Sequence, residues 1–289
     1  MSKGMIRAHT LIALLLFTLV AVSCSDDSGS GPLQPVYHDI DKARQAAAAH
    51  NLPLLIDFFT DDCKWCKRLD TTVLNTPKAE EYFTSRMVLA KVNGHQQTEL
   101  AGQYNVSAYP TLILLDTTGS EIDRIVGYRE AGPFFSTLDD YLVGKNTLAF
   151  LVQRYEEAPN RILAKKIADK YKYRGQAEQA YDWYGEVIAT GQPTDSLSAE
   201  AKMELADMER RAGNYDEALV QFEWIMNEFA DQPFAERAEL WRAYVLVKKE
   251  DTAAALTALR AFVEHYPGSD QTEWVMGQIR SLTGEGLQE

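Results

Sequence analysis

The order of apolar and polar residues predicts two parts of the chain with different secondary structure. In the first part, short runs rich in branched and aromatic residues predict strands at residues 53–60, 87–93, 109–116 and 121–128. Apolar residues at helical spacing predict helices at residues 39–51, 66–86, 99–105 and 131–144, with a break near Pro77. Strands that alternate with helices and end in a hairpin predict an α/β fold for residues 36–144, with a mixed central sheet flanked by helices.

Residues 146–289 have helical patterns only, and three similar segments recur among them. The segments read RGQAEQAYDWYGEVI, AGNYDEALVQFEWIM and KEDTAAALTALRAFV, and they start at Arg174, Ala212 and Lys249. Aligned on their second residue, the segments are spaced by 38 and 37 residues. All three share an alanine five positions on, at Ala180, Ala218 and Ala255. Four positions further each has a large apolar residue, at Tyr184, Phe222 and Leu259.

This recurrence resembles tetratricopeptide repeats, in which a small residue lets two antiparallel helices approach closely. The third segment departs most from the pattern, because Glu250 stands where the other two have Gly. A last helix around QTEWVMGQIRSL would cap the stack. The alternative is an ordinary helical bundle whose alanines and aromatic residues only fill a core. The repeated spacing favours an all-α tetratricopeptide-like repeat domain at residues 146–289, whose binding partner is left open.

The N-terminal residues have the pattern of a secretory signal. Lys3 and Arg7 precede an apolar run from Leu11 to Val22, which is short for a membrane span. The sequence AVSC resembles a bacterial lipobox, which implies a lipoprotein signal peptide at residues 1–23 and lipidation of Cys24. An uncleaved membrane anchor is the alternative. Residues 24–35 are polar and rich in Gly and Ser, which predicts a flexible tether.

Composition and charge limit the binding partners and the location that we expect for this protein. The chain has 42 acidic and 29 basic residues and a formal net charge of -13, which disfavours nucleic-acid binding. Such a chain would be held to a membrane by its N-terminal lipid and not by attraction to anionic head groups. We therefore expect a membrane-anchored lipoprotein of the bacterial cell envelope, facing the periplasm or another extracytoplasmic space. No flavin or nicotinamide motif is visible, so we expect no cofactor.

If Cys24 carries a lipid, one cysteine pair remains, Cys63 and Cys66 in the sequence CKWC. A C-x-x-C pair by itself fits half of a zinc site, a structural staple or a redox pair. Structural zinc needs four ligands, whereas the chain has no further Cys and its five His residues form no ligand motif. We therefore expect no metal at this pair within one chain, and a metal that bridges two chains is the alternative.

The surroundings of CKWC resemble the thioredoxin family over residues 36–144. The stretch LLIDFFTDDCKWCK matches the strand, the acid and the active-site helix of that family, with Asp57 six residues before Cys63. LAKVN matches the next strand, and VSAYPTLILLD matches the segment that carries the cis-proline, with Pro110 nineteen residues after Lys91. Gly127 in RIVGY stands where the family has a Gly in its hairpin. Several matches in the family's order imply that the cysteines are a redox pair.

The resemblance also implies roles for the residues at the pair. Cys63 would be the nucleophile, because the start of a helix favours its thiolate, and Cys66 would resolve the mixed disulfide. Asp57 lies in an apolar strand, so we expect its pKa to be raised. By resemblance Asp57 takes the proton of Cys66, and Lys91 is its neighbour. For both residues, a side chain that faces solvent is the alternative.

Three further residues are candidates for substrate binding. Pro110, if cis, would face Cys63 and offer backbone groups to an extended substrate, whereas a trans turn proline is the alternative. Tyr109 stands where the family usually has a small or β-branched residue, so substrate preference cannot be transferred. Trp65 would be either a hydrophobic docking surface or a partly buried ring that covers the site.

Two functions fit these observations. The first is a lipid-anchored thiol–disulfide oxidoreductase that acts on protein disulfides, takes electrons from a membrane donor and uses its repeats to recruit a partner or substrate. The second is an adaptor lipoprotein whose repeats bind a partner and whose thioredoxin-like half is a redox sensor or an inert platform. The direction of disulfide exchange is left open.

Overall fold

The computed structural model describes residues 36–192, 195–230 and 232–285. The predicted signal peptide (residues 1–23), the predicted tether (residues 24–35) and the predicted lipidation site Cys24 lie outside the described residues. In the described ranges, no helix combines the length and the apolar composition that crossing a membrane requires.

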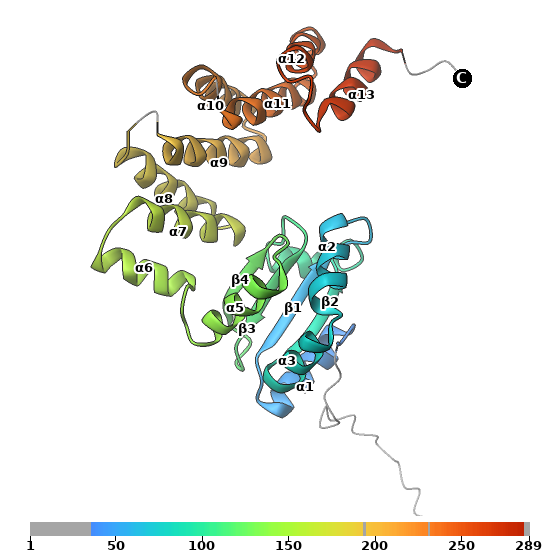
Figure 1. The fold of residues 1–289 in the computed structure, drawn as a ribbon, viewed down its shortest axis with the longest axis vertical. Helices are drawn as coiled ribbons and strands as arrows, with labels where there is room; N and C mark the ends of the chain where they lie inside the picture. Colours follow the sequence, from blue (N-terminus) through green and yellow to red (C-terminus); the bar gives the residue numbers. More distant parts are fainter. Residues whose placement is uncertain (1–35, 193–194, 231, 286–289) are drawn as a thin grey trace, which may run out of the picture.

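A four-stranded sheet forms the centre of residues 36–144, all of which the structure describes (Figure 1). Its strands are β1 (Leu54–Phe59), β2 (Val88–Asn93), β3 (Thr111–Leu115) and β4 (Glu121–Val126). Their order in space is β2-β1-β3-β4, with β1 parallel to β2 and the other two pairs antiparallel. The predicted mixed sheet and its closing hairpin are confirmed.

The helices of this part cover both faces of the sheet. They are α1 (Ile40–His50), α2 (Lys64–Leu69), the π-helical turn η1 (Asp70–Leu74), α3 (Pro77–Arg86), α4 (Thr98–Gln103) and α5 (Ala131–Leu142). Alternate residues of β1 point to opposite faces, so Leu55 packs with α3 and α5 while Ile56 packs with α1. The predicted break near Pro77 is present: the Thr76 side chain accepts the Ala79 N–H and caps α3.

The rest of the described chain is helical (Figure 1). Its helices are α6 (Leu148–Glu157), α7 (Arg161–Tyr173), α8 (Ala177–Ala189), α9 (Ser196–Ala212), α10 (Tyr215–Glu228), α11 (Pro233–Lys248), α12 (Thr252–His265) and α13 (Thr272–Thr283). Consecutive helices pack on one another along the stack, and α13 lies at its end as the sequence predicts.

The three aligned segments adopt the same local structure. The residue aligned at the start of each has a left-handed backbone, with φ of 71° at Gly175, 85° at Gly213 and 60° at Glu250. The shared alanines and the large apolar residues four positions later are fully buried: Ala180, Ala218, Ala255, Tyr184, Phe222 and Leu259. The helical repeats are therefore confirmed, and Glu250 adopts the conformation that glycine favours at the other two positions.

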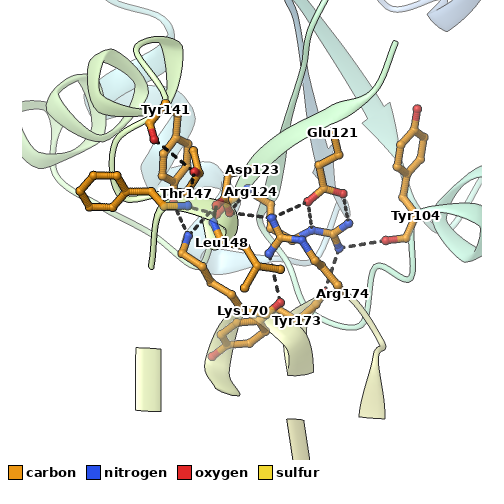
Figure 2. A network of polar contacts seen from close by, with 12 residues as sticks. Tyr104, Glu121, Asp123, Arg124, Tyr141, Thr147, Leu148, Lys170, Tyr173 and Arg174 are labelled. Atoms are coloured by element: carbon orange, nitrogen blue, oxygen red, sulfur yellow. Dashed lines mark hydrogen bonds and ion pairs between the residues drawn. The ribbon is translucent and has the colours of Figure 1, made fainter. Parts of the chain in front are cut away.

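Buried ion pairs join β4 to α7 (Figure 2). Asp123 is fully buried; its Oδ2 lies 2.9 Å from Lys170 Nζ, and its Oδ1 lies 2.9 Å from Arg174 Nη2. The backbone N–H of Leu148 donates to the same carboxylate at 2.7 Å. Removing one partner from such a cluster leaves an uncompensated charge in the interior, so the contact fixes the helical part against the sheet.

Arg124 makes a second set of contacts across the same junction (Figure 2). Its Nη1 donates to the backbone carbonyl of Tyr104 at 2.9 Å and to that of Tyr173 at 2.8 Å, and its guanidinium also binds Glu121. Tyr104 follows α4, and Tyr173 is the last residue of α7. One side chain of β4 therefore ties the segment before Pro110 to the first repeat.

Candidate active site

The CKWC sequence lies where β1 gives way to α2. Cys63 is the N-cap residue of α2, and its backbone N–H donates to the carbonyl of Thr60 at 3.2 Å, which closes the turn after the strand. Cys63 and Cys66 are joined in a disulfide with Cα atoms 5.3 Å apart. Cys63 is half-buried, whereas Cys66 is only 3% exposed. The sulfur of Cys63 is therefore the more accessible one.

The start of α2 directs a backbone donor at the sulfur of Cys63. The N–H of Cys66 lies 3.0 Å from Cys63 Sγ. N–H groups at a helix start have no partner in their own helix, and they favour negative charge on a nearby sulfur.

Asp57 and Lys91 form a buried ion pair beneath the first turns of this helical segment. The two residues are register partners on the parallel strands β1 and β2, and Asp57 Oδ2 lies 3.1 Å from Lys91 Nζ. Asp57 is 1% exposed, and its Oδ1 is buried without a hydrogen-bond partner among the described residues. The alternative of a solvent-facing Asp57 does not hold in this structure.

Burial and the neighbouring charges together set the pKa values of Asp57 and Lys91. Burial raises the pKa of Asp57 from 3.8 to about 6, although the charge of Lys91 acts in the opposite direction. For Lys91, burial alone would lower the pKa, but the carboxylates of Asp57 and Asp70 outweigh it and raise the pKa. A carboxyl with a pKa near 6 can exchange a proton near neutral pH, as a general base must.

Asp70 is a member of this cluster that the sequence analysis missed. It begins η1, and its Oδ1 contacts Lys91 Nζ directly. Lys91 therefore lies between two carboxylates, and the charge of Asp70 adds to the rise in the pKa of Asp57. A signal was available, because Asp70 follows Cys66 by four residues in a helical pattern and so shares its face.

The Tyr109–Pro110 peptide bond is cis. Thr111, the next residue, is the register partner of Phe58, so the proline lies beside the end of β1 from which the Cys63 turn departs. The ring of Tyr109 packs over Gly94, where an added Cβ would come within 2.1 Å of the Tyr109 hydroxyl. Gly94, which the sequence analysis did not single out, therefore makes room for this ring.

Trp65 is 50% exposed beside the cysteines. Its ring stacks on Tyr128 with 5.7 Å between centroids, and the guanidinium of Arg68 lies 4.7 Å from the centroid of the Tyr128 ring. Tyr128 directly follows Gly127 at the end of β4. The stack leaves an aromatic surface open to solvent next to Cys63, and Tyr128 is a part of it that the sequence analysis did not name.

No group of three or more His, Cys, Asp or Glu side chains in the described ranges is arranged to hold a metal ion. The cluster of Asp57, Asp70 and Lys91 has its own cation, the ammonium group of Lys91.

Comparison with known proteins agrees with this geometry. Residues 40–142 match the model of the thioredoxin-like domain family. A thioredoxin from Chlamydia caviae is 44% identical over 77 residues, which are 27% of this chain and 71% of that protein. The chain belongs to the thioredoxin family. A solution structure of a thioredoxin from Thermus thermophilus aligns with 39% of this chain and 89% of its own at 27% identity, with a TM-score of 0.35.

Two further matches are to a lipoprotein family and to a thiol:disulfide interchange protein. Residues 197–283 match the family model YfiO, described as outer membrane lipoprotein. The thiol:disulfide interchange protein DsbD of Yersinia pestis is 24% identical over 152 residues, or 47% of this chain. The match spans 26% of that relative, so most of its length has no counterpart in the match. The chain thus joins a thioredoxin-like domain to a repeat region similar to an envelope lipoprotein family.

Proposed function

We propose that the chain is a thiol–disulfide oxidoreductase that acts on protein disulfides, with Cys63 as nucleophile and Cys66 as resolving cysteine. The observation that supports it most is the accessible Cys63 sulfur at the start of α2, paired with a buried Cys66 in a thioredoxin-family domain. A strictly structural disulfide would need neither the accessible sulfur nor the buried acid and lysine nearby.

The reaction proceeds through a mixed disulfide. In the reduced chain, the Cys63 thiolate attacks one sulfur of the substrate disulfide, that bond breaks, and the departing substrate sulfur takes up a proton. The Cys66 thiol then loses its proton and attacks Cys63, which releases the second substrate thiol. The substrate gains two electrons and two protons, and the chain is left with the Cys63–Cys66 disulfide seen in the structure.

Asp57 accepts the proton of Cys66 in this scheme. Its raised pKa keeps it near the protonation midpoint at mildly acidic pH, and its unpartnered Oδ1 is free to receive a proton. Lys91 holds the other carboxylate oxygen and favours the ionised form. The role of these two groups is to make the thiolate of Cys66 available when the mixed disulfide has formed.

The cis-proline segment and the aromatic surface bind the substrate. Backbone groups next to Pro110 pair with an extended substrate segment, as in strand addition, while Trp65 supplies an exposed ring beside Cys63. Tyr109 acts through its backbone, because its ring is packed over Gly94.

The chain acts in the cell envelope as a lipoprotein. This part of the proposal uses the AVSC sequence, the similarity of residues 197–283 to an outer membrane lipoprotein family and the similarity to DsbD. Residues 1–23 are the signal peptide, Cys24 carries the lipid, and residues 24–35 are the tether. Residues 36–144 then form the redox domain and residues 146–289 the repeat domain, which binds a protein partner. A membrane dithiol returns two electrons to Cys63–Cys66 after each turnover.

Reduction of insulin disulfides by a small dithiol, with and without the full chain, tests the activity. We expect the wild type to accelerate precipitation of the insulin B chain and Cys63→Ser to have no effect. Equal rates of insulin precipitation with the wild type and with Cys63→Ser would contradict the proposal.

The substrates are identified with Cys66→Ser, which cannot resolve the mixed disulfide. In cells this variant should accumulate disulfide-linked complexes that dithiothreitol releases, and the double variant lacking Cys63 as well should not. Complexes that persist without Cys63 would point to the adaptor function, in which the repeats alone hold the partner.

A further inference from the structure

A cavity of about 730 Å³ lies between the thioredoxin-like part and the inner side of the repeats. One wall consists of the segment before Pro110 and the end of β4, and it includes Val106, Ala108 and Val126. The other wall comes from α7, α8, α9 and α11, and it includes Tyr173, Met203 and Trp241. The lining as a whole is more apolar than polar, and the cavity is shared between the two parts of the chain.

The lining of this cavity, called the groove from here on, adjoins residues of the candidate active site along the chain. Its lining includes Val126 and Gly127, and the next residue, Tyr128, stacks on Trp65 inside CKWC. Its lining also includes Ala108, two residues before the cis-proline. Residues of the groove are therefore direct chain neighbours of Tyr128 and lie within two residues of the cis-proline.

The wall before Pro110 has free backbone donors. The N–H groups of Ser107 and Ala108 have no hydrogen-bond acceptor in the described part of the chain, and both residues line the groove. Unpaired backbone N–H groups at a surface are the groups that an added extended strand uses. The occupant that fits this wall is a segment of polypeptide in an extended conformation.

The wall of the groove that the repeat helices form disfavours the binding of a strongly basic polypeptide segment. Its two carboxylates are already paired: Glu204 with Lys172 at 2.6 Å, and Asp207 with Arg210 at 2.6 Å and with Arg211 at 2.7 Å. The ring of Trp241 is covered on one side by the guanidinium of Arg210, 4.4 Å from its centroid. Besides these paired groups the wall offers apolar and aromatic contacts, and its cations Lys172, Arg211 and Arg237 outnumber its two carboxylates.

The two walls are held in place by the junction described above. Asp123 and Arg124 of β4 bind α7 (Figure 2). Val126 of the same strand lines the groove. Because the strand that forms one wall is tied to the helix that begins the other, the groove exists before a ligand arrives. A preformed site lowers the entropic cost of binding.

We propose that this groove binds an extended, apolar segment of the protein whose disulfide reacts at Cys63, with an aromatic or aliphatic side chain of that segment against Trp241. The proposal rests on the proposed oxidoreductase function and adds the class of substrate: a polypeptide that is unfolded or extended for several residues beside its cysteine. The repeats then act as part of the substrate site and not only as a tether to a separate partner.

Two synthetic probes test the proposal with the full chain in its reduced form. The short probe is Ala-Cys-Ala, and the long probe carries the same cysteine within about 20 residues in which Leu and Phe alternate with Ser. In both, the cysteine forms a mixed disulfide with thionitrobenzoate, whose release is coloured. The concentration dependence of the release rate gives a half-saturating concentration and a maximal rate for each probe.

We expect the long probe to half-saturate at about tenfold lower concentration than the short one. Trp241→Ala should raise the half-saturating concentration of the long probe about tenfold. It should leave the half-saturating concentration of the short probe and the maximal rate of each probe unchanged. Ala177→Trp, which adds bulk at an exposed position of the lining, should act in the same way without removing core packing. The matched control is Trp274→Ala, because Trp274 is 38% exposed on α13 and outside the lining.

The possible failures differ from one another. Equal half-saturation for the two probes, or an equal loss with Trp274→Ala, overturns the groove while the oxidoreductase function stands. If wild type and Cys63→Ser release thionitrobenzoate equally slowly from both probes, the oxidoreductase function fails, and the substrate groove fails with it. Circular dichroism and thermal unfolding of each variant confirm that the altered chains are folded.

Discussion

Asp57 and Lys91 lie opposite each other on neighbouring parallel strands, with Asp57 Oδ2 3.1 Å from Lys91 Nζ. Asp70 contacts the same ammonium group from η1. When all three groups are charged, the buried cluster carries one net negative charge. When Asp57 takes up a proton, the net charge of the cluster becomes zero. The environment of the cysteines therefore contains a carboxyl whose protonation is sensitive to pH near 6.

Asp57→Asn should stabilise the oxidised protein at neutral pH. The pKa of Asp57 is 3.8 in the unfolded chain and about 6 in the fold, so the fold holds a proton between these values that the unfolded chain has released. Stability therefore falls as pH rises through this window, and above it the ionised carboxyl costs on the order of 3 kcal/mol. Urea unfolding should show the variant more stable than wild type at pH 7, and the difference should approach zero as the pH falls below 3.8.

The same substitution should slow the second step of disulfide exchange. In the proposed mechanism the Asp57 carboxylate takes the proton of Cys66, and general-base catalysis contributes at least about 100-fold to such steps. Release of a peptide thiol from the mixed disulfide, followed by rapid quench, measures the rate. The first step, attack by Cys63, serves as an internal control and should be unaffected. A variant that slows both steps alike would contradict the assigned role.

Asp70→Asn and Lys91→Met should move the pKa of Asp57 in opposite directions. The charge of Asp70 raises this pKa, so its removal should bring the midpoint below about 6, whereas loss of the Lys91 charge should bring it above about 6. Titration of the Asp57 carboxyl carbon by NMR gives the midpoint directly. Shifts in the same direction would show that the substitutions act through the packing of β1 and η1.

Asp123→Ala should destabilise the junction between β4 and α7. It leaves Lys170 and Arg174 without their buried carboxylate, and breaking a buried pair in this way costs about 3–5 kcal/mol. The control is Arg86→Ala, whose pair with Asp139 is about half exposed, with side-chain exposure of 51% on each side, and should change stability by less than about 1 kcal/mol. Thermal unfolding and limited proteolysis near residue 145 compare the two, and equal effects would argue against a fixed junction.

Gly175→Ala should lower the free energy of unfolding more than Gly213→Ala does. Both glycines have a left-handed backbone, with φ of 71° and 85°, so an added Cβ costs about 1 kcal/mol at either position. At Gly175 the new Cβ would also lie 2.9 Å from the side chain of Asn105, five residues before the cis-proline. At Gly213 it would meet nothing within 4 Å. The difference in unfolding free energy therefore measures the contact that supports the segment before Pro110.

The sequence by itself determined the elements and most of their core. Runs of apolar residues with period 2 or 3.6 set which face of an element must be buried, and this is a local property of the chain. The same logic placed Ala180, Ala218 and Ala255 between paired helices, where all three are fully buried. The candidate site was located by resemblance to the thioredoxin family, because Asp57, Cys63 and Pro110 match positions of that family in the family's order.

The tertiary structure decided which side chains from distant segments meet. Asp70 joins Lys91 only because the fold brings η1 to β2, and Tyr128 reaches Trp65 only because the fold brings the segment after β4 to α2. The groove exists because Arg124 ties the ends of α4 and α7 together. Such contacts depend on the positions of whole elements in three dimensions, and no periodicity within a single segment of sequence encodes them.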